Sequence, residues 1–247
     1  MKLSIALLAL VMSAIAAYGQ TPKKTFKYLT PDETDPSRLL PPPPEDGTPT
    51  QIADMAAMWK LLKSRTPERF KQAQWDNDHE DISAFAATIG PDFDLNKLPA
   101  TVKLFAAVQN DENLLAVTAK AYFHRKFAAT LDPSLVPLNC DPADVMASVA
   151  QPGGRKSASY PSGHATMGYS FAIILAYLLP EKAQAIMARA QDYGDSREVC
   201  GDHYHDDVEA SHALGTAAGV MLLKNAALQP VIEASKAELR AAHLTMQ

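Results

Sequence analysis

Two segments in the second half of the chain carry residues that suit phosphate chemistry, and the first ends at His164. Ser162 and Gly163 precede this histidine, and an apolar stretch follows it. Serine is a good helix N-cap, and the free backbone N–H groups after it lie at the positive end of the helix dipole. Gly163 would let the backbone approach an anion closely, while His164 would bring a proton carrier to the same place. The segment predicts an anion site, although a capped helix with a surface histidine has the same pattern.

The second segment runs from Ser196 to Asp207. His203 and Asp207 are four residues apart, so they would share one face of a helix. A carboxylate beside an imidazole fixes its tautomer and stabilises the charge that the ring gains on attack. Arg197 offers a planar fork for phosphate oxygens. His203, His205 and Asp207 fit no common zinc spacing such as His-Glu-x-x-His, so we expect no metal here.

A third group of residues is cationic and follows a predicted helix. It consists of Lys120, Arg125 and Lys126. On its own this group is typical of a charged helix end and predicts no chemistry.

The elements that must position these segments have a helical pattern. Apolar residues recur at helical spacing in residues 52–62 and 104–123, with a break expected near Asn110. Further helices are expected over residues 165–179, 181–193, 206–227 and 231–243. No alternating strand pattern stands out, so residues 49–247 are predicted to form one all-α domain, a helical bundle.

The stretch Ala165 to Leu179 is nearly all apolar. It is short for a transmembrane span and contains Thr166 and Ser170. A helix that is apolar all round belongs in a protein core, and we favour a buried central helix over a membrane segment.

The first 19 residues have the plan of a secretory signal peptide. Lys2 precedes an apolar run from Leu3 to Ala17, and Gly19 marks one cleavage point, with Ala17 as another. A retained membrane anchor is the alternative. Cleavage would leave a periplasmic or secreted chain with no membrane attachment. Residues 20–48 are rich in proline and predict an extended N-terminal arm, stiffened at residues 41–44.

Composition narrows the function further. The chain has 247 residues, 47% of them apolar, and a net charge of -5 without a basic stripe, so we expect no nucleic-acid partner. Two cysteines, Cys140 and Cys200, favour a disulfide in an exported protein over two separate thiols. Such a bridge would stabilise the fold by about 4 kcal/mol on a chain-entropy argument.

Together the segments resemble the type 2 phosphatidic acid phosphatase superfamily, which also contains the vanadium haloperoxidases. Ser162-Gly163-His164 after a proline matches one motif, and Arg197, His203 and Asp207 match another in type and spacing. Within that superfamily the chain resembles the bacterial class A non-specific acid phosphatases. The arm at residues 39–44, the segment at residues 159–164 and both cysteines support this resemblance, which covers nearly the whole mature chain.

The resemblance implies a metal-independent acid phosphatase, without a cofactor, that hydrolyses small phosphate monoesters of broad specificity at acidic pH. It also implies a homo-oligomer. His203 would attack phosphorus and carry the phosphoryl group, Asp207 would orient His203, and His164 would protonate the leaving alcohol. The phosphate oxygens would be bound by Lys120, Ser162, Gly163 and Arg197.

One position departs from the family pattern. Seven residues after Lys120 the family has Arg-Pro, whereas this chain has Phe127 and Ala128. Another cation could replace the missing guanidinium, or the activity could be weakened or retuned. We favour replacement because the other motif residues are intact. The candidates are Arg125, Lys126, Arg155 and Lys156.

Three other functions compete with this hypothesis. In a vanadate-dependent haloperoxidase, His203 would ligate vanadium instead of attacking phosphorus. A lipid phosphatase would normally have several membrane spans, and apart from the apolar runs already described no stretch of this sequence is long enough to span a membrane. An inactive phosphate-binding relative draws its support from Phe127.

Overall fold

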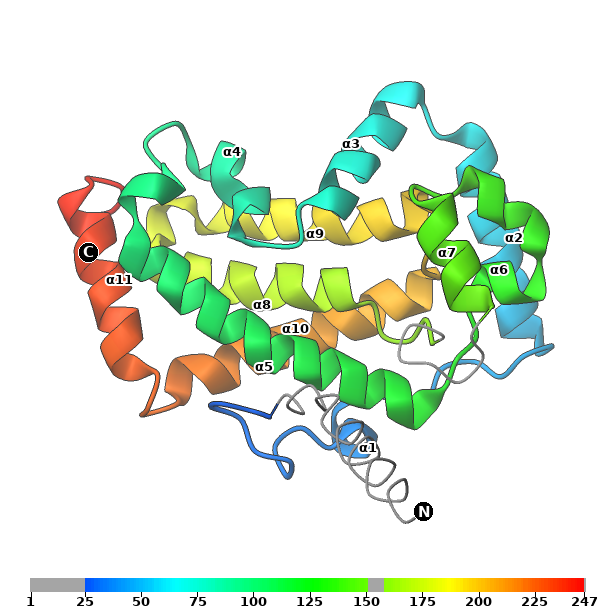
Figure 1. Cartoon of the computed structure of the whole chain (residues 1–247), viewed down its shortest axis with the longest axis horizontal. Helices are drawn as coiled ribbons and strands as arrows, with labels where there is room; N and C mark the ends of the chain where they lie inside the picture. Colours follow the sequence, from blue (N-terminus) through cyan, green and yellow to red (C-terminus); the bar gives the residue numbers. More distant parts are fainter. Residues whose placement is uncertain (1–24, 151–157, 247) are drawn as a thin grey trace, which may run out of the picture.

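The structure is a computed structural model, and it describes residues 25–150 and 158–246. Within these residues the regular structure is helical, and the one β-bridge, between Lys126 and Ala158, is isolated (Figure 1). The longer helices are α2 (Pro49–Ser64), α3 (Pro67–Asp78), α5 (Pro99–Phe123), α7 (Pro142–Val149), α8 (Gly163–Leu178), α9 (Ala183–Val199), α10 (His205–Lys224) and α11 (Gln229–Ala241). Short turns are α1 (Pro36–Leu39), α4 (Ala86–Ile89), α6 (Ala128–Leu131) and four 3-10 segments. The all-α prediction is confirmed, and the predicted signal peptide lies outside the described residues.

Helix α8 is the centre of the bundle. It lies between α9 and α10, while α5 crosses in front of them (Figure 1). Its buried side chains point in all directions around the helix, as expected for a core helix. In residues 25–150 and 158–246, no helix combines the length and apolar character that a membrane crossing requires.

Close contact between α8 and α10 depends on glycine. A Cβ atom built on Gly215 would lie 2.3 Å from the carbonyl oxygen of Thr166, and one on Gly219 would lie 2.8 Å from Cβ of Ile173. Larger residues at these positions would push the two helices apart. This contact matters for the site because α8 begins with Gly163 and His164, whereas α10 begins just after His203.

Helix α5 is continuous from Pro99 to Phe123, so the predicted break near Asn110 is wrong. Asparagine and aspartate usually weaken helices by bonding the local backbone. Here the side chains of Asn110 and Asp111 bond the N-terminal arm instead. The Asn110 amide donates to the carbonyl of Thr25, and the Asp111 carboxylate accepts three arm N–H groups.

Helices α9 and α3 also differ from the expectation. Helix α9 extends past Tyr193 to Val199, because Gly194 allows close packing against Val208 and does not end the helix. Helix α3 was not predicted, since it carries few apolar residues. Its buried Asp76 instead accepts hydrogen bonds from Arg189 and Ser196 of α9.

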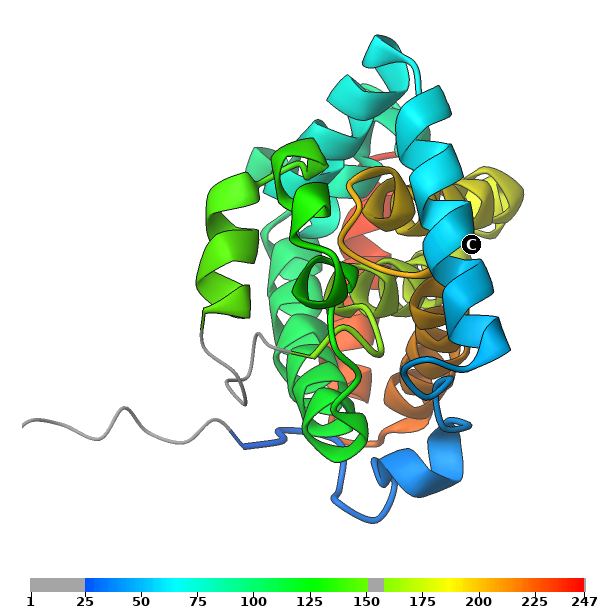
Figure 2. The same ribbon diagram turned by 90° about the vertical axis from the view of Figure 1, so that its right-hand side faces the viewer.

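One disulfide and the hydrogen bonds of one arginine hold the end of α9 in place. Cys140 and Cys200 form the predicted disulfide, with their Cα atoms 4.8 Å apart. Arg65, after α2, donates to the backbone carbonyls of Val199 and Leu138. The end-on view in Figure 2 shows α2 and α7 on opposite flanks of this end of the bundle. The turn that follows α9 is therefore fixed from two sides.

The first prediction concerns the arm. The Asp111 carboxylate is fully buried and accepts N–H groups of Lys27, Tyr28 and Leu29 at 2.7, 2.6 and 2.7 Å. Asp111→Asn removes the charge and turns an N–H donor toward these donors, so it should lower the free energy of unfolding by about 2–4 kcal/mol. Urea denaturation measures this. Asp92→Asn, at an exposed carboxylate, should change it by less than about 0.5 kcal/mol. Equal effects would show that Asp111 does not anchor the arm.

Candidate active site

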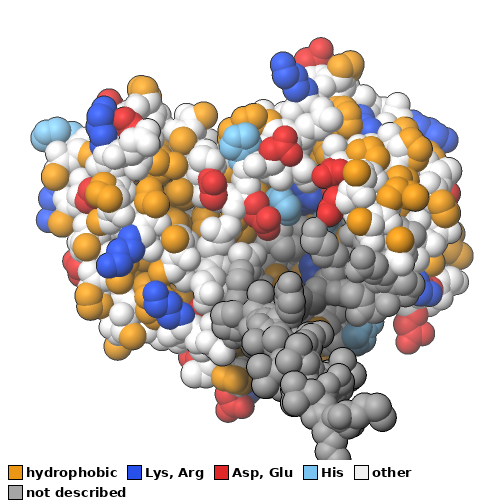
Figure 3. Space-filling model, viewed as in Figure 1, with side chains coloured by type: hydrophobic (Ala, Val, Ile, Leu, Met, Phe, Trp, Pro, Cys, Tyr) orange, Lys and Arg blue, Asp and Glu red, His pale blue; other side chains and the backbone are white. Residues whose placement is uncertain are grey.

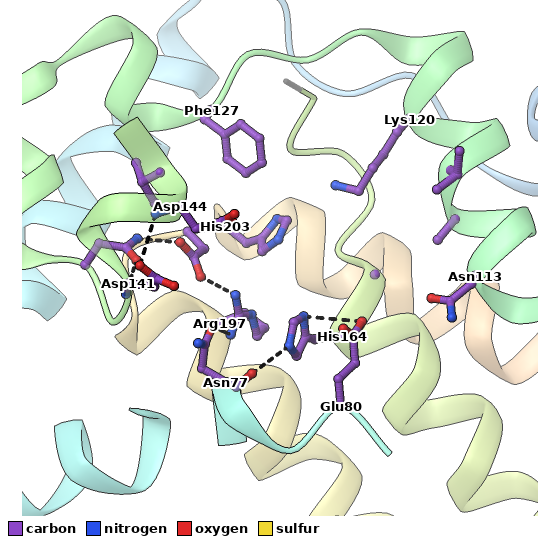
Figure 4. A pocket seen from close by; sticks show the side chains of 16 residues that line it. Asn77, Glu80, Asn113, Lys120, Phe127, Asp141, Asp144, His164, Arg197 and His203 are labelled. Carbon is purple, nitrogen blue, oxygen red and sulfur yellow. Dashed lines mark hydrogen bonds and ion pairs between the residues drawn. The ribbon is translucent and has the colours of Figure 1, made fainter. Parts of the chain in front are cut away.

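A cavity of about 530 Å³ lies where α5, α7, the start of α8 and the end of α9 meet (Figure 4). Five of the seven predicted site residues line it: Lys120, Gly163, His164, Arg197 and His203. Ser162 and Asp207 are buried directly behind the cavity surface. In the space-filling view of Figure 3, acidic side chains gather near the middle of the face that is turned to the viewer. Glu80, Asp141 and Asp144 are among the residues that line the cavity.

His203 lies in the turn between α9 and α10. Because α10 begins at His205, the prediction that His203 and Asp207 share a helical face is wrong. The turn passes through Gly201, whose φ of +75° suits glycine, and the N–H groups of Asp202 and His203 donate back to the carbonyl of Arg197.

His203 and Asp207 nevertheless interact, although only Asp207 lies on α10. Asp207 lies in the first turn of α10, where its Oδ2 accepts the N–H of Tyr204 at 3.0 Å. The same oxygen lies 3.4 Å from Nδ1 of His203. The carboxylate therefore caps the helix and orients the imidazole at once. This arrangement directs Nδ1 to Asp207, so that Nε2 is the ring nitrogen that can react.

Burial sets the protonation of this pair. Burial lowers the pKa of His203, and the hydrogen bond to Asp207 opposes that shift only in part. For Asp207, burial favours the neutral acid, but the hydrogen bond and charge of His203, with the charges of Arg125 and Lys120, outweigh it and lower its pKa. The pair thus favours a neutral imidazole beside a carboxylate.

Arg125 completes the polar chain behind His203. Its Nη1 lies 2.8 Å from Oδ1 of Asp207, and its Nη2 lies 2.8 Å from Oδ2 of Asp54 on α2. The guanidinium also stacks over the ring of Tyr204, 4.0 Å from its centroid. The Arg125 side chain is 2% exposed and that of Asp207 is fully buried. Sequence reasoning did not assign a role to Asp54, because its distance along the chain from Asp207 gives no sign of the contact.

The structure excludes two of the four cations that could replace the missing arginine at position 127. Arg125 lies behind Asp207 and does not line the cavity, so the prediction that Arg125 could replace the missing guanidinium as a phosphate ligand is wrong. Lys126 is also outside the cavity and pairs with Asp46 at the surface. Arg155 and Lys156 lie outside the described residues. Phe127 itself lines the cavity, and its ring centroid is 5.7 Å from that of His203.

The start of α8 supplies the second histidine. Ser162 caps the helix through its Oγ, which accepts the N–H of Ala165 at 3.3 Å, as predicted. His164 lies beyond it, with Nε2 3.2 Å from the carbonyl oxygen of Asn77 and Nδ1 3.6 Å from Oε1 of Glu80. Burial, followed by the charge of Arg197, holds the pKa of His164 well below its usual value.

Two cations complete the site, and each is held by neighbouring polar groups. Arg197 donates to Oδ1 of Asn77 at 2.8 Å and to the carboxylate of Asp202. Lys120 donates from Nζ to the carbonyls of Ala158 and Ser159 at 2.6 and 3.0 Å. Burial lowers the pKa of Lys120 to about 8. Both cations are thereby directed into the cavity beside His203 (Figure 4).

Several groups that support the site carried no signal in the sequence. They are Asp54, Asn77, Glu80, Asn139 and Asp202. Asn77 lies in the last turn of α3 and Glu80 lies just after that helix. Because the apolar pattern of α3 is weak, only its packing against α9 brings them to His164 and Arg197. Across the part of the chain that the structure describes, no three histidine, cysteine, aspartate or glutamate side chains are grouped so as to hold a metal ion.

Comparison with known proteins gives a consistent result. The sequence pattern of the PAP2 superfamily matches residues 106–228. An acid phosphatase of Zymomonas mobilis subsp. mobilis is 31% identical over 226 residues, which are 90% of this chain and 80% of that protein. A non-specific acid phosphatase of Providencia stuartii is 28% identical over 88% of this chain and 86% of its own length. One of Salmonella typhimurium is 31% identical, over 76% of this chain and 74% of its own length.

The second prediction compares two neighbouring cations that each pair with an aspartate at 2.8 Å. Arg125→Met leaves the buried Asp207 carboxylate without its guanidinium and should lower the free energy of unfolding by about 3–5 kcal/mol. Lys126→Met breaks a surface pair in which the lysine side chain is 55% exposed, and should cost less than about 1 kcal/mol. Urea denaturation of both variants tests this. Similar small losses would mean that Arg125 is not needed to hold Asp207.

Proposed function

The chain belongs to the PAP2 superfamily, and from its likeness to bacterial non-specific acid phosphatases we propose that it hydrolyses small phosphate monoesters through a phosphohistidine on His203. The observation that carries this proposal is the setting of His203. Its ring faces a cavity that is also lined by the cationic side chains of Lys120 and Arg197, and its Nδ1 is directed to the buried carboxylate of Asp207. A neutral imidazole held in this way can attack phosphorus with Nε2.

Arg197, Lys120 and the start of α8 supply the binding of phosphate. In phosphoryl transfer, negative charge spreads over the equatorial oxygens of the phosphoryl group, so preorganised cations and N–H groups provide most of the stabilisation. The N–H groups around Gly163 lie at the positive end of α8 and open onto the cavity. Ser162 is fully buried, so we assign its hydroxyl to capping α8 and leave its predicted contact with phosphate as an untested expectation.

The reaction then has two steps, phosphoryl transfer to His203 and hydrolysis of the phosphohistidine. Nε2 of His203 forms a bond to phosphorus while the ester P–O bond breaks, and protonated His164 gives its proton to the leaving alkoxide. Water next attacks phosphorus and breaks the N–P bond, while neutral His164 takes the proton from this water. Free phosphate leaves, and both imidazoles return to their starting state. We infer that no metal is required, because side chains and the α8 backbone provide the positive charge.

The size of the cavity and the disulfide support two further parts of the proposal, the substrate specificity and the cellular location. A phosphate group fills only a small part of a cavity of about 530 Å³, which leaves room for varied alcohols and supports broad specificity. The disulfide between Cys140 and Cys200 suits an oxidising compartment, so we propose a periplasmic or secreted protein. The homo-oligomer that the resemblance implies stays a prediction, which sedimentation analysis would test.

The third prediction tests the nucleophile. His203→Ala should lower kcat/KM for p-nitrophenyl phosphate by at least about 10³-fold. His205→Ala is the matched control, since His205 is exposed, pairs with Glu198 outside the cavity and should be dispensable. EDTA should leave the wild-type rate unchanged, and vanadate should inhibit it. Full activity in His203→Ala, or an EDTA loss that zinc or magnesium restores, would contradict the mechanism.

The fourth prediction concerns pH. His203 must be neutral to attack, so the rate rises with pH through its pKa, while His164 must be protonated to donate, so the rate falls through its pKa. Burial lowers both pKa values, and a bell-shaped profile of kcat/KM should have its optimum on the acidic side of neutral. Asp207→Asn removes the hydrogen bond and the charge that raise the pKa of His203, so the limb of the profile that reports His203 should move to lower pH as the rate drops. A rate that climbs steadily to about pH 9 would rule out these roles.

A further inference from the structure

Of the residues that the structure describes, Lys120, Arg197 and Phe127 lie around the face of His203 that opens to the cavity (Figure 4). Two of them are cations. Phe127 has an apolar ring, which lies 5.7 Å from the His203 ring and 5.6 Å from Nζ of Lys120, centroid distances in both cases. Val145 of α7 also lines the cavity and is buried. Within the described residues, the surroundings of the nucleophile therefore include two cations, Lys120 and Arg197, and an apolar ring at Phe127.

This asymmetry concerns the equatorial positions of the phosphoryl group. Attack by Nε2 of His203 places the leaving oxygen in line behind phosphorus, where His164 must protonate it. A substrate group beside His203, in contact with Phe127, is therefore not the leaving alcohol. It is one of the three equatorial substituents of phosphorus.

Phosphate monoesters and diesters differ at these positions. A monoester presents three non-bridging oxygens and carries between one and two negative charges, because its second pKa is near 6. Each of these oxygens gains from a cation or an N–H donor. A diester carries one negative charge on two non-bridging oxygens, and its third equatorial substituent is an ester oxygen with an organic arm. Such an arm is better placed against an apolar ring than against a guanidinium.

We propose that the apolar wall at Phe127 accepts the second ester arm of a phosphate diester, and that the protein also cleaves diesters with an apolar or aromatic arm. This inference rests on the proposed function of His203 as nucleophile and His164 as acid. Arg197 and Lys120 would hold the two non-bridging oxygens, and the retained arm would lie along Phe127 and Val145. Phe127 thereby determines specificity.

The chemistry is the same two-step transfer. His203 forms the N–P bond, the P–O bond of the departing alcohol breaks, and His164 supplies its proton. The intermediate is a phosphohistidine that still carries the second ester arm. Water attacks phosphorus, the N–P bond breaks, and His164 accepts the proton. One diester and one water give one alcohol and one phosphate monoester, with no other reactant.

The experiment compares three substrates with one leaving group: p-nitrophenyl phosphate, methyl p-nitrophenyl phosphate and phenyl p-nitrophenyl phosphate. Wild-type protein should cleave both diesters, and kcat/KM should be about tenfold or more higher for the phenyl arm than for the methyl arm, because the phenyl group reaches the apolar wall. His203→Ala should abolish all three reactions. Diester cleavage that persists in His203→Ala comes from another enzyme and overturns the proposal.

Two variants test the role of the ring. Phe127→Arg should raise kcat/KM for the monoester and lower it for the phenyl diester, changing their ratio by about 10²-fold or more. Tyr122→Arg adds the same charge on a side chain that is 55% exposed and does not line the cavity, so it should leave the ratio unchanged. Phe127→Ala removes the ring without adding a charge and should abolish the preference for the phenyl arm. It keeps the test decisive if Phe127→Arg does not fold.

The outcomes separate this inference from the proposed function. His203-dependent cleavage of the monoester alone would refute diester cleavage and leave the phosphatase proposal standing. Equal rates with methyl and phenyl arms, or a phenyl preference that survives Phe127→Ala, would refute the role of Phe127. Loss of monoester cleavage in every preparation, or monoester cleavage that His203→Ala leaves intact, would instead refute the proposed function.

Discussion

The buried carboxylate of Asp207 is the constraint on which the site depends. A carboxylate without contact with solvent is stable as an anion only if charges and hydrogen bonds replace its hydration. Asp207 obtains them from three directions: the guanidinium of Arg125, the N–H of Tyr204 and the imidazole of His203. His203 and Tyr204 are neighbours in the turn before α10, whereas Arg125 follows α5. Folding must therefore bring the residues after α5 to the turn between α9 and α10 before this anion can be buried.

The helix packing meets this requirement. Gly215 and Gly219 let α10 approach α8 closely, which places the start of α8, with His164, beside the turn that carries His203. The disulfide and Arg65 fix the end of α9 just before that turn. Arg125 in turn links Asp207 to Asp54, so α2 is connected to the same polar chain. The two histidines thus owe their relative positions to backbone contacts and buried charges outside the cavity.

Neighbouring residues hold the charged groups of the cavity in place. Asp202 and Asn77 hold Arg197, and Glu80 lies next to His164. Lys120, with a pKa lowered to about 8 by burial, is held by backbone carbonyls. Where a further cation is expected from the family pattern, Phe127 meets the cavity with an apolar ring. Among the described residues, the positive charge of the cavity wall lies at Arg197 and Lys120, which favours an anion placed toward these two side chains and away from Phe127.

The sequence by itself determined the helical class, the disulfide and the residues that can do chemistry. These follow from short-range properties: the period of apolar residues, an even cysteine count, and motifs in which His164, Arg197, His203 and Asp207 have characteristic neighbours. It did not determine the continuity of α5, because the bonds that satisfy Asn110 and Asp111 come from an arm some 80 residues away. It also could not show that Arg125 supports Asp207 while Phe127 faces the cavity. Residues two apart in a non-helical segment point in different directions, and only the packing of α2, α5 and α10 decides which of them meets the buried carboxylate and which meets the substrate.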